Sequence, residues 1–163
     1  MTQDIPRIRR ARLGEADGTL AIDWKGGGHD TVDLAGLIAS DPLFAPLADI
    51  FLFAKVEVID WGAAVSWGDG VELSGTSLRR LAEAQRPMTG ADLAGFQKAK
   101  DISNQELADL IGRSLSIVKD YKAGRQPIPL AVAAAVRSMV DPVIFAAHYR
   151  PARKAGRPRK QNA

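Results

Sequence analysis

The segment Ser103–Pro127 constrains the fold more than any other part of this chain, because it has the pattern of two short helices joined by a tight turn. Ser103 stands three residues before Glu106, which is the spacing of a capping box at the start of a helix. Apolar residues follow at helical spacing, at Leu107, Leu110 and Ile111. The small Ala108 suits a close crossing by a second helix. The segment therefore predicts a first helix with one inward face.

The second half of this pattern begins at a turn. Gly112 favours the left-handed conformation that ends a helix, and Ser114 is a second N-cap. Val118 and Tyr121 are spaced as the inward face of the helix that follows. Gly124 is placed to end that helix, and prolines at 127 and 129 prevent its continuation.

With its caps and core spacing together, Asp101–Pro129 resembles the lambda-repressor-like helix-turn-helix family of bacterial and phage regulators. The positions that carry the resemblance are Ile102, Ser103, Glu106, Leu107, Ala108, Ile111, Gly112, Ser114, Val118, Tyr121, Gly124 and Pro127. The resemblance implies a repressor-like transcription regulator that binds double-stranded DNA as a homodimer at a two-fold symmetric site.

The family places the second helix of the motif in the major groove and braces the first helix on the phosphate backbone. Carried over by position, the residues of the recognition helix that would meet DNA are Ser114, Leu115, Ser116 and Lys119. The residues expected near phosphates are Asn104, Gln105, Lys122 and Arg125.

Three features depart from the family pattern. Arg113 stands where an apolar residue is usual, Leu115 and Ile117 make the reading face less polar, and Asp120 adds a negative charge near it. These departures weaken the expectation that the helix reads bases directly more than they weaken the expectation of the fold. The alternative is therefore a helical bundle that keeps this fold in order to bind a protein partner.

The charge of the chain is divided unevenly along the sequence. Residues 1–86 hold nine Lys and Arg against thirteen Asp and Glu, a net charge of −4, whereas residues 87–163 hold thirteen against six, a net charge of +7. A basic half favours a polyanionic partner. Most of this excess lies beyond residue 149, because residues 87–149 hold seven basic and six acidic side chains.

A basic tail over residues 150–163 follows the helical region and is expected to be disordered alone. We expect it to meet DNA through Arg153, Lys154, Arg157, Arg159 and Lys160. Gly156-Arg157-Pro158 resembles the core of an AT-hook, which implies a contact in the minor groove of A·T-rich DNA, although Ala155 replaces the usual preceding arginine. The alternative is a solvated tail that contacts phosphates without sequence preference.

The first half of the chain predicts strands, turns and short helices. Thr19–Trp24 alternates apolar and polar residues as a half-buried strand does, and the glycines at 26–28 predict the tip of a hairpin. Phosphate binding at these glycines lacks the lysine and the helix that it needs. Large apolar residues expected to fill the core are Phe44, Leu47, Phe51 and Phe53. Ser74 and Ser77 are both candidate caps for a helix that ends near Gln85.

Residues 5–81 resemble an uncharacterised bacterial α+β domain of unknown function, through the strand at 20–24, Val32-Asp33-Leu34 and the segment 65–73. Genes for that domain often lie beside a small toxin-like protein. The resemblance implies an antitoxin-like role in binding a toxin-like partner, with ligand sensing and homodimer contact as alternatives. Arginines at 7, 9, 10 and 12 allow nucleic-acid contact, or a solvated edge strand blunted by charge.

The predicted fold class is α+β. A small N-terminal antiparallel-sheet domain with short helices (1–86) precedes an all-α helix-turn-helix domain of four to five helices (87–149) and the basic tail (150–163). The breaker cluster Pro87-Met88-Thr89-Gly90 marks the boundary between the domains.

Several classes of function are not expected. The chain has no cysteine, which excludes disulfides and thiol chemistry, and it has only two histidines, His29 and His148. No motif for a catalytic triad is evident, so we expect no enzyme, no cofactor and no metal. The carboxylates of Asp23, Asp30 and Asp33 could cluster, but ordinary solvated positions account for them. No run of about 18 apolar residues exists, so we expect no membrane span and a cytoplasmic location.

Overall fold

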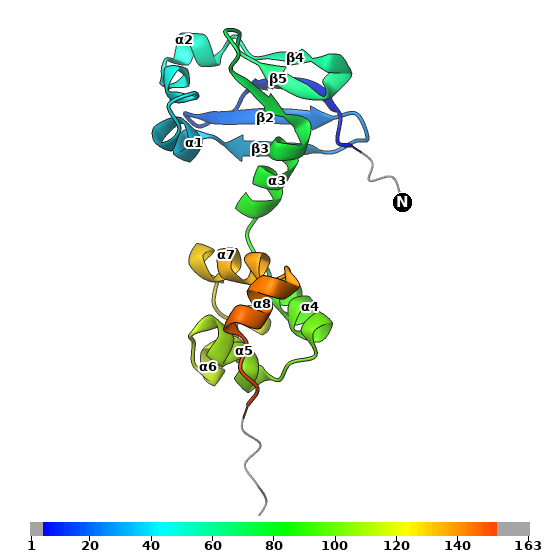
Figure 1. Ribbon diagram of the computed structural model, residues 1–163, viewed down its shortest axis with the longest axis vertical. Helices are drawn as coiled ribbons and strands as arrows, with labels where there is room; N and C mark the ends of the chain where they lie inside the picture. Colours follow the sequence, from blue (N-terminus) through cyan, green and yellow to red (C-terminus); the bar gives the residue numbers. More distant parts are fainter. Residues whose placement is uncertain (1–4, 153–163) are drawn as a thin grey trace, which may run out of the picture. The chain divides into compact units, whose positions relative to one another are not determined.

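The computed structural model describes residues 5–152 and divides the chain into two compact units, one ending at Arg86 and the other beginning at Pro87 (Figure 1). The α+β fold class predicted from the sequence is confirmed. No single helix in the described part is long and apolar enough to cross a membrane, and the helices at 130–138 and 142–148 have the necessary length and composition only as a pair bent by 115°.

The first unit holds two three-stranded antiparallel sheets, each with its strands in chain order. The first sheet comprises β1 (Ile8–Leu13), β2 (Thr19–Trp24) and β3 (His29–Asp33); the second comprises β4 (Glu57–Ile59), β5 (Ala64–Ser66) and β6 (Glu72–Ser74). Between and after the sheets lie α1 (Ala35–Ser40), η1 (Ala45–Ala48), α2 (Ile50–Phe53), η2 (Asp60–Gly62) and α3 (Gly75–Gln85), where η marks a 3₁₀ helix.

The core of the first unit follows the alternation of β2. Leu20, Ile22 and Trp24 are buried, whereas Ala21 and Asp23 between them are not. α3 packs against β3 and begins where expected, because the Ser74 side chain accepts a hydrogen bond from the backbone N–H of Ser77 at 3.0 Å. Ser74 is therefore the cap, and Ser77 is not.

The expectation that Phe51 fills the core is wrong. The Phe51 side chain is 80% exposed, whereas Phe53 is buried and stacks on Trp67 with ring centroids 5.9 Å apart. α2 is a single turn, and side chains two residues apart in a helix point to nearly opposite sides. Only one of these two phenylalanines can therefore face inward.

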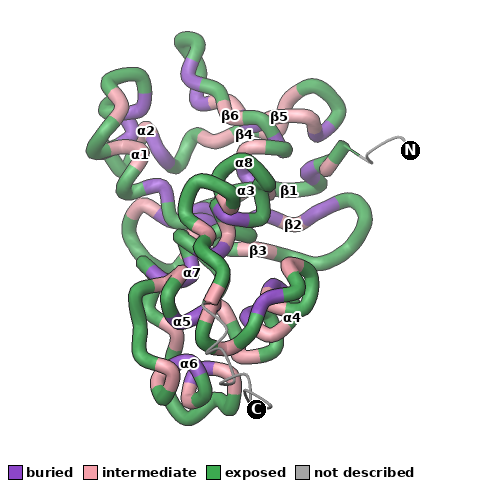
Figure 2. The backbone as a smooth tube through the Cα atoms, turned by 60° about the horizontal axis from the view of Figure 1, so that its bottom comes forward, coloured by how far each residue is buried: buried purple, intermediate pink, exposed green. Residues whose placement is uncertain are grey.

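The second unit is all helical, with α4 (Gly90–Lys100), α5 (Asn104–Ile111), α6 (Leu115–Lys122), α7 (Leu130–Ser138) and α8 (Pro142–His148). Its core is formed by residues from α4, α5, α6 and α7 and the loops that follow helices: Leu93, Phe96, Ile102, Leu107, Ala108, Val118, Tyr121, Val132, Val136 and Met139. Phe145 of α8 packs against this core. In Figure 2 the buried positions of α4, α5 and α6 face the interior of this unit. Pro129 precedes α7 as its N-cap.

Candidate nucleic-acid interface

Helices α5 and α6 have the caps and the turn that the sequence predicted. Ser103 and Glu106 form a reciprocal capping box, in which the Glu106 carboxylate accepts from the Ser103 N–H at 2.7 Å and the Ser103 hydroxyl accepts from the Glu106 N–H at 3.2 Å. Gly112 has a φ of 63°, and the Arg113 N–H donates to the Ala108 carbonyl at 2.9 Å. This closing bond is that of a Schellman turn, so α5 stops sharply before α6 begins.

α6 divides its residues between the core and solvent. Ser114 caps it by accepting from the Ile117 N–H at 3.3 Å. Val118 and Tyr121 are buried, Leu115 and Ile117 are half-buried, and Ser116 and Lys119 are exposed. Ser116 and Lys119 are three residues apart and so share one face of the helix. That face holds two of the four side chains of this helix that are expected to meet DNA, with the cap Ser114 exposed at its start.

Lys122 and Asn104, expected near phosphates, have partners inside the unit. The Lys122 ammonium donates to Gln97 Oε1 at 2.5 Å and to Asn104 Oδ1 at 2.9 Å. Gln97 Nε2 also donates to Asn104 Oδ1 at 3.1 Å and to the Ile102 carbonyl at 3.0 Å. This polar cluster ties α4, α5 and α6 together. Sequence reasoning missed Gln97, because the contact joins residues that no helical spacing relates.

The other two residues expected near phosphates are exposed but also paired. Gln105 Nε2 donates to Asp109 at 2.9 Å, and Arg125 Nε donates to Asp120 at 2.7 Å. The second pair accounts for Asp120, whose negative charge departs from the family pattern, because the positive charge of Arg125 compensates it. Arg113 is exposed in the turn, so no apolar residue is needed at that position.

Glu106 joins the helix-turn-helix to the last described residues of the chain. Its carboxylate accepts from the Tyr149 hydroxyl at 2.7 Å and from the Ala152 N–H at 3.1 Å, in addition to the Ser103 N–H. The hydrogen bonds from Ser103, Tyr149 and Ala152 lower the pKa of Glu106 to about 2. The basic tail therefore leaves the unit beside the first turn of α5; its Arg153, Lys154, Arg157, Arg159 and Lys160 lie outside the described residues.

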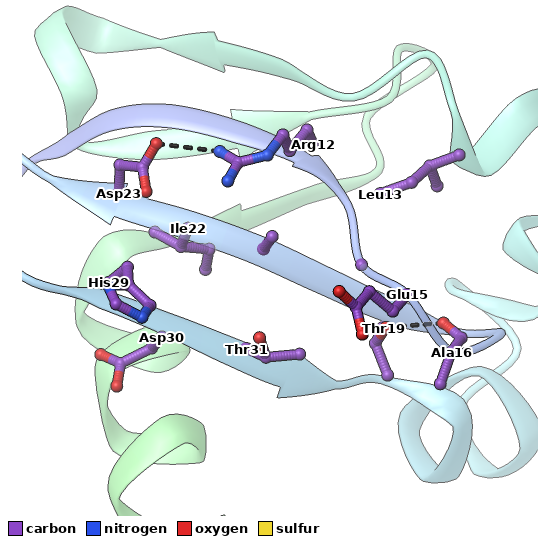
Figure 3. Close-up of a pocket in the computed structure, with 12 residues that line it drawn as sticks. Arg12, Leu13, Glu15, Ala16, Thr19, Ile22, Asp23, His29, Asp30 and Thr31 are labelled. Carbon is purple, nitrogen blue, oxygen red and sulfur yellow. Dashed lines mark hydrogen bonds and ion pairs between the residues drawn. The ribbon is translucent and has the colours of Figure 1, made fainter.

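A second candidate surface lies on the first unit, where the exposed face of the first sheet forms a hollow of about 570 Å³ (Figure 3). Arg12 donates to Asp23 across it at 2.9 Å, and this hydrogen bond lowers the pKa of Asp23. Thr31 and the exposed His29 lie on β3 beside this pair.

Asp30 makes its contacts with α3 and Trp24, apart from the Arg12–Asp23 pair. Its carboxylate accepts from Arg86 at 2.7 Å, from Trp24 Nε1 at 2.7 Å and from Arg79 at 3.3 Å. Burial alone would raise the pKa of Asp30, but the hydrogen bonds from Arg86 and Trp24 outweigh it and lower the pKa. Asp33 instead accepts from the Ala35 N–H at 2.8 Å. The three carboxylates therefore have separate partners, and no group of three metal-ligating side chains forms within residues 5–152.

Comparison with known proteins bears mainly on the first unit. Residues 9–84 match the model of a family described as "Protein of unknown function (DUF2442)". The predicted resemblance of the first half to a domain family of unknown function is thereby confirmed. The match ends before the helical unit, so the resemblance of residues 101–129 to the lambda-repressor-like family stays a prediction.

A search of curated proteins found no match. Among solved structures, the chain is similar to "Putative DNA Binding Protein NE0471" from Nitrosomonas europaea ATCC 19718, with 23% sequence identity and a TM-score of 0.44. The similarity covers 83% of this chain and 86% of that one.

Proposed function

We propose that this protein is a DNA-binding transcription regulator that binds double-stranded DNA through α6, without catalysis. The observation that carries the proposal is the face of α6 that presents Ser116 and Lys119 to solvent, on a helix capped at Ser114 and anchored by Val118 and Tyr121. A lysine can donate to guanine O6 and N7 in the major groove, and a serine can hydrogen-bond to several bases.

The order of the helices supports this proposal. The turn at Gly112 fixes how α6 follows α5, and the Gln97–Asn104–Lys122 cluster fixes both against α4. A recognition helix needs such rigid support, because its side chains must reach base edges in a fixed register. We propose that Gln105, Arg113 and Arg125 lie nearest the phosphates, whereas Lys122 and Asn104 act chiefly as support.

The test is selection of duplex sites from a random library, followed by competition with random duplex at fixed salt. Enrichment of a defined sequence is expected. Lys119→Ala and Ser116→Ala should each change the preference at one or two base pairs, at a cost of about 1–3 kcal/mol for the preferred site. Lys98→Ala removes an exposed charge from α4 and is the matched control, which should keep the preference. A library that yields no preferred sequence would contradict the proposal.

We propose a homodimer as the DNA-binding form, with the exposed apolar residues of α7, of α8 and of the loop between them at the two-fold contact. Leu130, Val140 and Val143 are 71%, 64% and 78% exposed. Apolar groups that are this exposed on one unit favour self-association. Val143→Glu is expected to give a monomer in sedimentation equilibrium and to weaken binding to a two-fold symmetric site. A native chain that sediments as a monomer on and off DNA would exclude the dimer.

A second candidate function, binding of a toxin-like protein partner, is favoured by the apolar surface around α2. A hollow of about 690 Å³ is lined mainly by apolar residues of α1, η1 and α2, including Ile38 and Ile50. Leu43 and Phe51 are exposed in the same segment. Phe51→Ser should abolish co-purification with the product of an adjacent toxin-like gene and leave DNA binding unchanged. Unchanged co-purification would exclude this surface.

A further inference from the structure

The turn η2 on the first unit carries an exposed tryptophan whose role neither the fold nor the proposed function explains. Trp61 is 88% exposed, whereas Trp24 and Trp67 are 1% and 5% exposed. An indole this exposed contributes nothing to the core, and tryptophan is enriched where proteins contact other molecules, so Trp61 is a candidate contact residue.

The backbone that presents Trp61 is strained. Asp60 and Trp61 have φ values of 52° and 53°, in the left-handed region that non-glycine residues rarely adopt, and Gly62 follows at 93°. Position 62 requires glycine, because a Cβ there would lie 2.3 Å from the Ile8 carbonyl oxygen. Such strain costs about 1–3 kcal/mol per residue and is concentrated at functional sites.

Two cations flank this turn. Arg7 donates to the Asp60 carbonyl at 3.1 Å, and the Lys25 ammonium donates to the Trp61 carbonyl at 2.7 Å. Their backbones are also joined, since the Lys25 N–H donates to the Arg7 carbonyl at 2.8 Å. Within residues 5–152 no carboxylate lies within 4.0 Å of either cation, so neither forms an ion pair with this part of the chain.

The same two cations, which hydrogen-bond to the turn, also line a hollow of about 540 Å³ together with Arg79 and Glu83. Arg79 lies 4.0 Å over the Trp24 ring and is paired with Asp30, so it serves the fold. The other charged groups that line the hollow are the cations of Arg7 and Lys25 and the carboxylate of Glu83, so the excess of positive charge favours an anion there.

A flat aromatic face beside two cations that form no ion pair within residues 5–152 matches a nucleotide, whose base stacks while its phosphate meets positive charge. In duplex DNA the faces of the bases are already covered by their neighbours, so an unpaired base is required. We propose that Trp61, Arg7 and Lys25 form a site for an unpaired nucleotide of a single strand, separate from the duplex-binding face of α6. A protein partner is disfavoured, because two cations lie close to the tryptophan and charged residues are depleted at the centre of protein interfaces.

The fluorescence of Trp61 gives a direct test in the full chain. Oligothymidylate of about a dozen residues, a length within the range of single-strand sites, is expected to quench the emission from exposed tryptophan and leave that of Trp24 and Trp67. Quenching of equal strength by thymidine monophosphate would show that the site binds a free nucleotide, and would overturn the proposal that it binds a single strand. If an abasic strand or polyglutamate bound equally well, binding would depend on charge alone. That result would overturn the proposal that a base stacks on Trp61.

Variants separate this site from the fold and from the duplex site. With a labelled strand, Trp61→Ala should weaken binding about tenfold, and Trp61→Phe should retain most of it, since base stacking on an aromatic ring is lost only in the first. Lys25→Ala should reduce the slope of the logarithm of the binding constant against the logarithm of the salt concentration by about 0.7, which is the value for one phosphate contact on a single strand. Lys55→Ala, at the other end of β4, is the matched control and should change neither.

Trp61→Gly gives a second measurement. Glycine relieves the strained φ but has more freedom to lose on folding, and the two effects are of similar size. This variant should therefore unfold within a few degrees of the native chain, yet bind the strand as weakly as Trp61→Ala. A much lower unfolding temperature would show a structural role for Trp61 and overturn the proposal. So would dissociation of an oligomer by Trp61→Ala. Lys119→Ala should leave single-strand binding intact, so failure at this site and failure at α6 are distinguishable.

Discussion

Glu106 shows how one carboxylate can serve both local structure and the course of the chain. It caps α5 by accepting from the Ser103 N–H and holds the end of the described chain by accepting from Tyr149 and the Ala152 N–H. Because all three donors favour the charged form, its pKa falls to about 2 from an ordinary value of 4.5. A carboxyl group with a lowered pKa stabilises the folded state above its unfolded pKa, and this stabilisation is lost as the pH falls toward the folded pKa.

Replacement of Glu106 by Gln should therefore change the pH dependence of stability. At neutral pH the variant should unfold at a lower temperature, because Gln offers a weaker acceptor to the three donors. As the pH is lowered from about 5 to about 2, the midpoint temperature of thermal unfolding should fall more steeply for the native chain than for the variant. Asp109→Asn, which removes an acid from the same helix, is the control and should keep the native slope. If the unfolding temperatures of the native chain and of Glu106→Gln changed in parallel with pH, the Glu106 carboxylate would not stabilise the fold in the way inferred here.

At the scale of elements, packing of α4 against α6 depends on one glycine. Gly90 opens α4, and a Cβ there would lie 2.5 Å from the carbonyl oxygens of both Tyr121 and Lys122. Only a residue without a side chain allows the two helices to approach this closely. Gly95 lies in the middle of the same helix, and a Cβ there would meet nothing within 4 Å.

These two glycines give a matched pair of variants. Gly90→Ala should destabilise the second unit by about 3 kcal/mol, because backbone atoms must move apart. Gly95→Ala should stabilise it by about 0.5–1 kcal/mol, the difference in helix propensity. Denaturant unfolding of both variants checks the pair. Equal effects would mean that the close approach of α4 and α6 does not limit stability.

The sequence predicted those elements that local chemistry determines. The caps at Ser74, Ser103 and Ser114, the turn at Gly112 and the alternation of β2 all depend on neighbours in the chain, and each is confirmed. Contacts between distant residues were not predictable. The Gln97–Asn104–Lys122 cluster and the placement of Trp61 beside Lys25 depend on how elements pack, and the exposure of Phe51 depends on a single helical turn that has no periodic signal.

At the scale of the whole molecule, the two units have separate hydrophobic cores. One core is built on Leu20, Trp24 and Leu78, and the other on Leu93, Leu107 and Val118. A core that needs no residue from the other unit favours independent folding. The position of Pro87 at the boundary suits a break between cooperative units.

Fragments cut between residues 86 and 87 should therefore each fold alone. We expect each to unfold within a few degrees of the transition that it shows in the full chain, and calorimetry of the full chain should resolve two transitions or fit as their sum. An unfolded fragment, or one much less stable than the same residues in the full chain, would show that the units depend on each other.

The separate contributions of α6 and the basic tail to DNA binding also belong to the scale of the whole molecule. The folded residues 87–149 have a net charge of only +1, so most of the positive charge of the second half lies in residues 150–163. Glu106 holds Ala152 beside the first turn of α5, which places the start of the tail at the end of the helix that we propose to face phosphates. We therefore expect the tail to supply affinity and α6 to supply sequence preference.

Truncation after Ala152 tests this division, because it removes five cations and keeps the hydrogen bond to Glu106. It should weaken binding to all duplexes about equally, by ten- to a hundredfold near 0.1 M salt, and reduce the salt slope by about 0.9 for each phosphate that the tail neutralises. Lys119→Ala should instead lower affinity for the preferred site more than for random duplex, with a slope change of at most about one. Titration of both variants on preferred and random duplexes across a salt series checks the difference. If truncation altered the ranking of sequences, the tail would be reading bases itself, as an AT-hook in the minor groove does.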